Sequence, residues 1–263
     1  MTFALIGLLI LLALLGLPLF VALAGGSLLA TYNAGLDPAL LAVELNRLAS
    51  SPYLAAIPLF TLAGVVLAAG GAPQRMIQLF NATVGWLPGG MAGVAIASCA
   101  FFTAFSGASG VTILALGGLM FPMLVHAGYK ERFTLGLLTT SGSLGLMFAP
   151  SLAILLYGIV AGVSIDQMFL AGIFPGVLLM VMLGLYAMFI GRSADVPRHR
   201  FSFATLGKAL GEGFWDLLLP VGVLVGIFGG YVTISEASAC TAVYVILLEG
   251  VIHREIHLLK HMP

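Results

Sequence analysis

The longest uncharged stretch of this chain runs from Met76 to Tyr129 and contains no Asp, Glu, Lys or Arg. One helix needs only about 20 apolar residues to cross a bilayer. A stretch of this length therefore crosses and returns, or enters and leaves the membrane on one side. We expect its turn at residues 106–110, which read Ser-Gly-Ala-Ser-Gly. Irregular backbone is tolerated at membrane depth only where protein buries it or where it lines a watery cavity.

Other apolar runs predict membrane-spanning helices with polar or amphipathic segments between them. Spans are predicted at residues 3–29, 53–69, 167–190, 214–233 and 237–253. Pro18 is expected to kink the first of these spans. An amphipathic helix along the membrane surface is predicted at residues 38–50, and a short helix that is either tilted or interfacial at residues 76–87. A charged loop is predicted at residues 192–203, followed by a short amphipathic helix at residues 205–213.

Residues 91–125 are too few for two complete spans and a turn, which together need about 40 residues. We therefore expect a re-entrant helical hairpin with its tip near the middle of the membrane; two short tilted spans are the alternative. If the chain returns to the side it left, the Lys and Arg residues that flank the predicted spans gather on one side, and only Arg47 lies opposite. Cytoplasmic loops carry an excess of Lys and Arg. This side is thus predicted to be cytoplasmic, and the N-terminus is predicted to lie there too.

The composition indicates an all-α polytopic membrane protein. Hydrophobic residues make up 61% of the 263 residues and charged residues only 8%, whereas soluble domains carry about 25% charged residues. The net charge is zero, so nothing points to nucleic acid as a partner. The two cysteines, Cys99 and Cys240, lie in apolar runs and are expected to be free thiols.

A second irregular segment is predicted inside the helical run at residues 133–163. Pro150 removes a backbone donor, and Gly142 and Gly145 loosen the helix before it, so carbonyl groups at residues 146–149 lose their helical partners. The two irregular segments together carry the hydroxyl groups of Ser106, Ser109, Thr112, Ser141, Ser143 and Ser151. Such oxygens suit Na⁺, and the helix N-termini predicted at residues 109–112 and 150–152 suit an anion.

These two clusters admit a structural and a functional interpretation. Ser and Gly also let membrane helices pack closely, which would give the clusters a structural role alone. Because both clusters lie in uncharged runs, we favour the ion and substrate site of a secondary transporter. No Lys or Arg lies there, so we expect hydroxyl groups, helix dipoles and backbone to bind a carboxylate substrate, with Thr112, Ser141 and Ser151 as its ligands. An intramembrane enzyme would need an Asp pair, a Ser with a basic partner or a metal cluster within the spans, and the sequence indicates none.

Acidic residues and histidines outside these clusters have simpler expected roles. Glu236 could cap the helix that follows it or dock a partner, and we favour the cap. Asp166 is predicted to lie in the first turn of its helix. His253, His257 and His261 recur at a spacing that suits metal ligands. They lie among charged residues, so we expect a solvated helix face and no metal site beyond the one for sodium.

Three blocks of the sequence resemble one transporter family. They are residues 56–71 (AIPLFTLAGVVLAAGG), 100–122 (AFFTAFSGASGVTILALGGLMFP) and 135–176 (LGLLTTSGSLGLMFAPSLAILLYGIVAGVSIDQMFLAGIFPG), and residues 217–249 match more loosely. Over nearly its whole length the chain is similar to the large membrane subunit, or DctM-type permease, of TRAP (tripartite ATP-independent periplasmic) transporters.

This resemblance implies a sodium-coupled, elevator-type importer of small organic acids, such as C4-dicarboxylates, in the bacterial inner membrane. It implies two protein partners: a periplasmic solute-binding protein that delivers the substrate, and a small four-helix membrane subunit. By motif match, Ser106, Gly107 and Ser109 take the sodium-binding role at the hairpin tip, and Gly145 and Pro150 take it in the broken helix. The resemblance implies no cofactor besides the coupling Na⁺.

The chain departs from the family pattern in two respects. Relatives commonly carry a Pro-Pro-Ser-x-Pro-like run where residues 149–153 read Ala-Pro-Ser-Leu-Ala, which alters the expected ion geometry. The family's subunit is also longer and contains a second, inverted repeat. We therefore interpret residues 1–263 as a single transmembrane domain, with a first repeat at about 1–203 and the truncated start of a second at 204–263. Two alternatives stay open: a truncated remnant that does not transport, and another ion-coupled secondary transporter.

Overall fold

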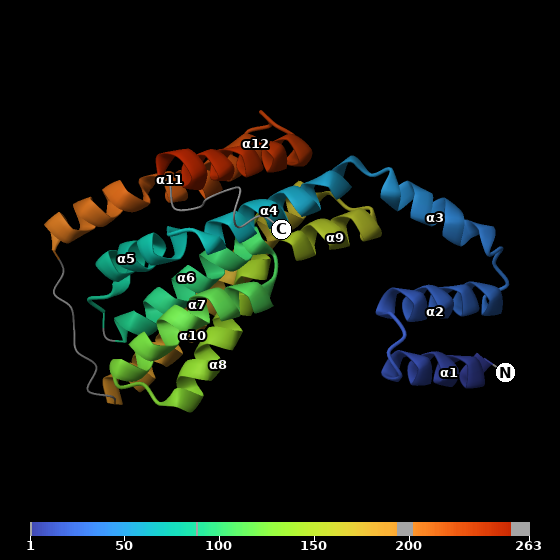
Figure 1. Ribbon diagram of the computed structural model, residues 1–263, viewed down its shortest axis with the longest axis horizontal. Coiled ribbons are helices and arrows are strands. Elements are labelled where there is room, and N and C mark those ends of the chain that lie inside the picture. Colours follow the sequence, from blue (N-terminus) through green and yellow to red (C-terminus); the bar gives the residue numbers. More distant parts are fainter. Residues whose placement is uncertain (1, 88, 194–201, 254–263) are drawn as a thin grey trace. The chain divides into compact units, whose positions relative to one another are not determined.

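The computed structural model describes residues 2–87, 89–193 and 202–253, and these ranges contain helices and no β-strand (Figure 1). The chain forms two compact units, Met1–Leu54 and Ala55–Pro263. Five of the described helices are long and apolar enough to cross a membrane, and one bent helix pair can add a sixth crossing. The prediction of an all-α polytopic membrane protein is therefore confirmed.

The first unit contains three helices, α1 (Thr2–Leu14), α2 (Leu19–Asn33) and α3 (Ala39–Ala49). The prediction of one span at residues 3–29 is wrong, because the chain turns back between α1 and α2. Gly16 adopts a φ of 102°, which favours glycine, and the Leu17 N–H donates a hydrogen bond to a carbonyl in the last turn of α1. The two helices pack side by side, with Leu9 against Gly25 (Figure 1). The prediction of a cytoplasmic N-terminus assumed a single membrane crossing at residues 3–29. Because the chain turns back here, the structure does not support that assumption.

The predicted spans at residues 53–69, 167–190 and 237–253 are confirmed as helices. They correspond to α4 (Ala56–Ala69) after the short turn η1 (Pro52–Ala55), to α10 (Ile165–Ser193), and to α12 (Ile234–Leu247) continued by the π-helical turn η3 (Leu248–Ile252). The two helices predicted at residues 205–213 and 214–233 are instead one helix, α11 (Phe203–Phe228). Gly213 lies inside α11 and faces Met76, so this glycine allows close packing and does not end a helix.

The helix α6 (Gly90–Ser106) lies at the centre of the second unit. It packs against α4, α10, α5 (Ala72–Val84), α7 (Ser109–His126) and α8 (Glu131–Leu144). Alanine and other small residues cover much of its surface, and such residues let membrane helices approach closely. Phe102 and Phe105 are buried among the neighbouring helices. The first arm of the predicted hairpin is thus enclosed by protein on almost every side.

Two acidic residues and both cysteines lie where the sequence predicts them. Glu236 forms a capping box with Thr233, and Asp166 lies in the first turn of α10, so both predicted roles are confirmed. Cys99 and Cys240 are both free thiols. His257, His261 and most of the predicted charged loop lie outside the described residues.

Candidate functional site

The predicted hairpin tip is a two-residue break between α6 and α7. α6 ends at Ser106, and the Gly107 N–H closes its last turn by donating to the Thr103 carbonyl at 2.9 Å. Gly107 has a φ of 63°, a conformation that favours glycine. A Cβ atom on Gly107 would also lie only 2.6 Å from the Leu152 Cβ. The following residue is extended, and α7 begins at Ser109.

The predicted broken helix is present as α8 and α9 (Leu152–Ala161), whose axes bend by 46°. A short 3-10 turn, η2 (Gly145–Met147), and an irregular stretch that contains Pro150 separate them. The Phe148 N–H donates to the Gly145 carbonyl at 3.1 Å. Pro150 has no N–H with which to continue the helix, so α9 starts anew at Leu152.

Glycines bring these two breaks into contact. A Cβ atom on Gly145 would lie 2.5 Å from the Thr103 Cβ, so η2 lies directly on α6. Gly64 of α4 approaches the tip equally closely, since its Cβ would lie 2.5 Å from the Ser106 Cα. Together with Leu152 of α9, these contacts enclose the tip. We call the place where the hairpin tip meets the broken helix, residues 103–112 and 145–152, the junction.

Four buried hydroxyl groups lie at the junction. The Ser106 and Thr112 hydroxyl oxygens are 3.0 Å apart and share a hydrogen bond. Ser151 and Thr103 are fully buried, and neither hydroxyl has a hydrogen-bond partner among the described residues. Burying a hydroxyl without a partner is unfavourable, so these two oxygens are the ones at the junction most in need of a ligand.

Helix ends supply the electrostatics of the junction, because no charged residue lies in either run of sequence. The carbonyl ends of α6 and α8 meet there, and so do the N–H ends of α7 and α9. Helix C-termini carry partial negative charge and favour a cation, whereas N-termini favour an anion. Neutral groups can therefore bind a cation and an anion side by side, as broken helices do in secondary transporters.

Comparison with known proteins identifies the family. Residues 6–262 match the model of the Tripartite ATP-independent periplasmic transporter, DctM component. The chain belongs to this family. It is 36% identical to the C4-dicarboxylate TRAP transporter large permease protein DctM of Vibrio cholerae, over 80% of this chain and 47% of that protein. It is 32% identical to the ectoine TRAP transporter large permease protein TeaC of Halomonas elongata, over 97% of this chain and 61% of that protein.

A third relative of this DctM-family chain is the isethionate TRAP transporter permease protein DctMQ of Oleidesulfovibrio alaskensis, 35% identical over 92% of this chain and 38% of that protein. The chain spans about half the length of the curated relatives it matches. Family membership confirms the resemblance drawn from the sequence blocks. The family match and the apolar helices together identify a multi-pass membrane protein of this family, whose curated relatives are named as transporter permease proteins and not as enzymes.

The structure gathers most of the residues that the sequence predicts to bind ligands. Those that lie at the junction are Ser106, Gly107, Ser109, Thr112, Gly145, Pro150 and Ser151. Ser141 is buried in α8, but its hydroxyl donates to the Leu137 carbonyl at 2.6 Å within the same helix. Ser143 is exposed and so does not belong to the buried cluster.

Thr103 is a candidate residue that the sequence did not single out. It precedes Ser106 by three residues, and residues at this spacing share one face of a helix. This three-residue spacing is the sequence signal by which Thr103 could have been found. However, Thr side chains inside helices often bond to their own backbone, so the sequence does not distinguish Thr103 from a structural threonine.

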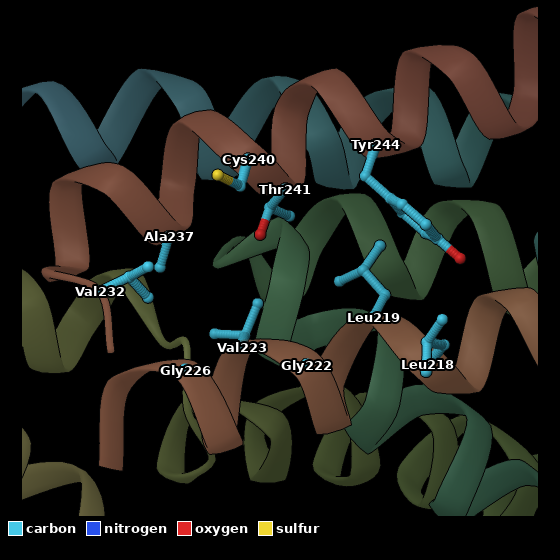
Figure 2. A pocket seen from close by; sticks show the side chains of 10 residues that line it. All are labelled: Leu218, Leu219, Gly222, Val223, Gly226, Val232, Ala237, Cys240, Thr241 and Tyr244. Atoms are coloured by element: carbon cyan, nitrogen blue, oxygen red, sulfur yellow. The ribbon is translucent and has the colours of Figure 1, made fainter. Parts of the chain in front are cut away.

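A separate hollow of about 320 Å³ lies between α11 and α12 (Figure 2). Leu219 and Val223 of α11 face Thr241 and Cys240 of α12 across it, as Figure 2 shows, and its lining is mainly apolar. The Tyr244 hydroxyl at its edge donates to the Trp215 carbonyl at 2.9 Å. Because few polar groups converge on this hollow, the junction is the stronger candidate site.

Proposed function

We propose that this chain provides an ion- and substrate-binding site of a TRAP-type large permease subunit, which imports small organic acids together with Na⁺. The observation that carries the proposal is the junction, where two buried hydroxyls that have no hydrogen-bond partner in the described parts of the chain lie beside four helix ends. We interpret α6 and α7 as a re-entrant hairpin with its tip near the middle of the bilayer. In support, the two helices and the turn between them occupy residues 90–126, fewer than the roughly 40 residues that two complete crossings and a turn need.

Sodium is bound in this proposal by oxygen atoms from both breaks. The proposed ligands are the residues matched to the family motifs: Ser106, Gly107, Ser109, Gly145 and Pro150. Serine contributes hydroxyl oxygen, and glycine and proline contribute carbonyl oxygen. Thr103 adds a buried hydroxyl next to Gly145. The partial negative charge at the ends of α6 and α8 supports a cation here.

The substrate in this proposal is an organic acid that binds beside the sodium ion. Relatives are named for C4-dicarboxylate, ectoine, isethionate and 2,3-diketo-L-gulonate, so family membership alone does not select one compound. Thr112 and Ser151 lie near the N-terminal ends of α7 and α9, where an anion is favoured. Ser141 can donate to a substrate only if it releases its bond to Leu137.

The proposal includes the partners that the family implies. A periplasmic solute-binding protein delivers the substrate, and a small four-helix membrane subunit completes the complex in the bacterial inner membrane. The hairpin and the broken helix then alternate access by moving against the flanking spans. The TRAP transporter names of the relatives support this assembly.

Replacing Ser106 tests the sodium site. A hydrogen bond to a charged group contributes about 1.5–3 kcal/mol, so Ser106→Ala should raise the Na⁺ concentration for half-maximal binding roughly tenfold or more. Binding of radioactive Na⁺ to the purified chain in lipid nanodiscs measures this without requiring transport. Thr139→Ala is the control, because it removes an exposed hydroxyl that bonds only within α8. Unchanged Na⁺ binding in both Ser106→Ala and Ser109→Ala would exclude the site.

A further inference from the structure

One guanidinium joins three elements in the buried part of the second unit. Arg75, in the first turn of α5, donates from Nε to Asp216 Oδ2 at 2.7 Å and from Nη2 to Asp216 Oδ1 at 3.2 Å. The same Nη2 forms an ion pair with Glu249 Oε1. Asp216 belongs to α11, and Glu249 belongs to the turn η3 that continues α12. The residue exposures are 9% for Arg75, 1% for Asp216 and 0% for Glu249, so this charged triad is buried.

The turn between α4 and α5 closes over the triad. Gly70, in this turn, lies so near Glu249 that a Cβ atom on it would overlap the carboxylate. Beside Arg75 on α5, Met76 packs against Gly213 of α11, with its Cε 3.0 Å from where a Cβ would lie. α12 packs along α4. Four helices, α4, α5, α11 and α12, therefore meet around one buried cation, and we call these four helices the frame.

The frame touches the hairpin through contacts of a different kind. α4 meets the tip through Gly64, which lies against the Ser106 backbone. α5 meets α6 through the rings of Phe80 and Phe101, whose centroids are 6.4 Å apart. Neither of these contacts involves an ion pair. Apolar surfaces can slide past each other, whereas separating buried ionic partners leaves uncompensated charge in a medium of low dielectric constant.

We propose that Arg75 is a positioning residue that locks α4, α5, α11 and α12 into one rigid frame, against which the hairpin tip is held and moves. This inference rests on the proposed transport function and deepens it, because it identifies which part stays fixed during the cycle. Without the guanidinium, Asp216 and Glu249 would be two buried carboxylates that repel each other. The middle of α11 and the end of α12 would then separate from α5.

Distances between pairs of spin labels, measured by pulsed EPR, test this proposal. Exposed Thr83 of α5 and Val243 of α12 report on the frame, and exposed Leu114 of α7 with Val243 reports on the hairpin relative to the frame. Each label is attached to an introduced cysteine in the full chain, which is placed in nanodiscs. Cys99→Ala and Cys240→Ala remove the two native thiols, so that only the introduced cysteines are labelled. We expect the frame distance to be narrowly distributed and insensitive to Na⁺, and the hairpin distance to shift with Na⁺.

Arg75→Met removes the guanidinium and keeps an apolar chain in its place. We expect the narrow frame distribution to be lost in this variant. Arg47→Met is the matched control, because Arg47 is an exposed residue of α3 that pairs with Glu44 of the same helix. If Arg75→Met does not fold, the triple variant with Asp216→Asn and Glu249→Gln removes all three charges together. It should fold, because no buried charge is left unpaired. Its frame distribution should still be broader than in wild type, because the ion pairs that join the three elements are gone.

Two results would overturn the inference: an unchanged frame distribution in the Arg75 variants, or a wild-type frame distance that shifts with Na⁺. A different result would count against the proposed function alone. Arg75→Met could broaden the distribution of the frame distance while the hairpin distance stays the same with and without Na⁺. This result would support the rigid frame and contradict the proposed coupling to sodium. The two proposals are therefore distinguished by separate label pairs.

Discussion

The junction and the charged triad bury polar groups in opposite ways. The junction holds neutral hydroxyls, and those of Thr103 and Ser151 have no hydrogen-bond partner among the described residues. The triad instead holds ionised groups that bind one another across three elements. Neutral oxygens with available lone pairs can take up and release an ion, whereas buried ion pairs are held by the cost of separating them. The buried polar groups of the junction are thus suited to binding and releasing an ion, whereas those of the triad are suited to holding helices rigidly together.

Breaking the triad should have the largest effect on stability. Arg75→Met leaves two buried carboxylates without their cation, and breaking a buried pair in this way typically costs about 3–5 kcal/mol of unfolding free energy. Thermal or denaturant unfolding in detergent measures the loss. The triple variant that also carries Asp216→Asn and Glu249→Gln should recover most of it. If the triple variant is no more stable than Arg75→Met, charge is not the reason for the loss.

Filling the space at the hairpin tip should have an intermediate effect. Gly107→Ala forces a Cβ against Leu152 at a positive φ, and overpacking of this kind costs about 1–3 kcal/mol. The same unfolding measurement applies, and Na⁺ binding should weaken as well. Gly118→Ala in α7 is the matched control, because a Cβ there meets open space. Wild-type stability in Gly107→Ala would contradict the close contact between the tip and α9.

Removing a hydroxyl from the junction should have the smallest effect on stability. Thr103→Val removes a buried hydroxyl without a described partner, so without Na⁺ the unfolding free energy should stay within about 0.5 kcal/mol of wild type or rise. The increase in unfolding temperature that Na⁺ produces should shrink, because a bound ligand stabilises in proportion to its affinity. Unfolding at a series of Na⁺ concentrations measures both quantities.

Thr134→Val is the control for this hydroxyl. Thr134 is also fully buried and also lacks a described hydrogen-bond partner, but it lies at the opposite end of α8 from the junction. We expect its replacement to leave the response to Na⁺ unchanged. An equal response to Na⁺ in both valine variants would remove Thr103 from the proposed ligand set.

The two breaks in the helices were predictable because residues at the breaks themselves cause them. Ser and Gly at residues 106–110 and Pro150 mark places where a helix cannot continue, and the structure ends or starts helices at both. The triad was not predictable in this way. Arg75 lies 141 residues from Asp216 and 174 from Glu249, and each charge alone resembles a residue at the membrane edge. Only the packing of α5 on α11 and of α4 on α12 brings the three together.

Glycine explains the two wrong helix boundaries. Gly16 takes a positive φ and turns the chain, so that the predicted first span divides into α1 and α2. Gly213 stays helical and admits Met76, so that two predicted helices become α11. The residue type is the same, and its effect depends on whether another helix approaches it. That information belongs to the tertiary structure and not to the local sequence.

The enclosure of α6 by protein changes how amino-acid replacements in it should be interpreted. In α10, only 11% of the apolar span is buried, so a larger apolar side chain can extend into lipid. Ala92 and Ala95 of α6 are fully buried among neighbouring helices and have no such space. An Ala95→Leu replacement would make the segment more hydrophobic and would still disrupt it. For amino-acid replacements in α6, the volume of the new side chain therefore predicts loss of stability better than its hydrophobicity does.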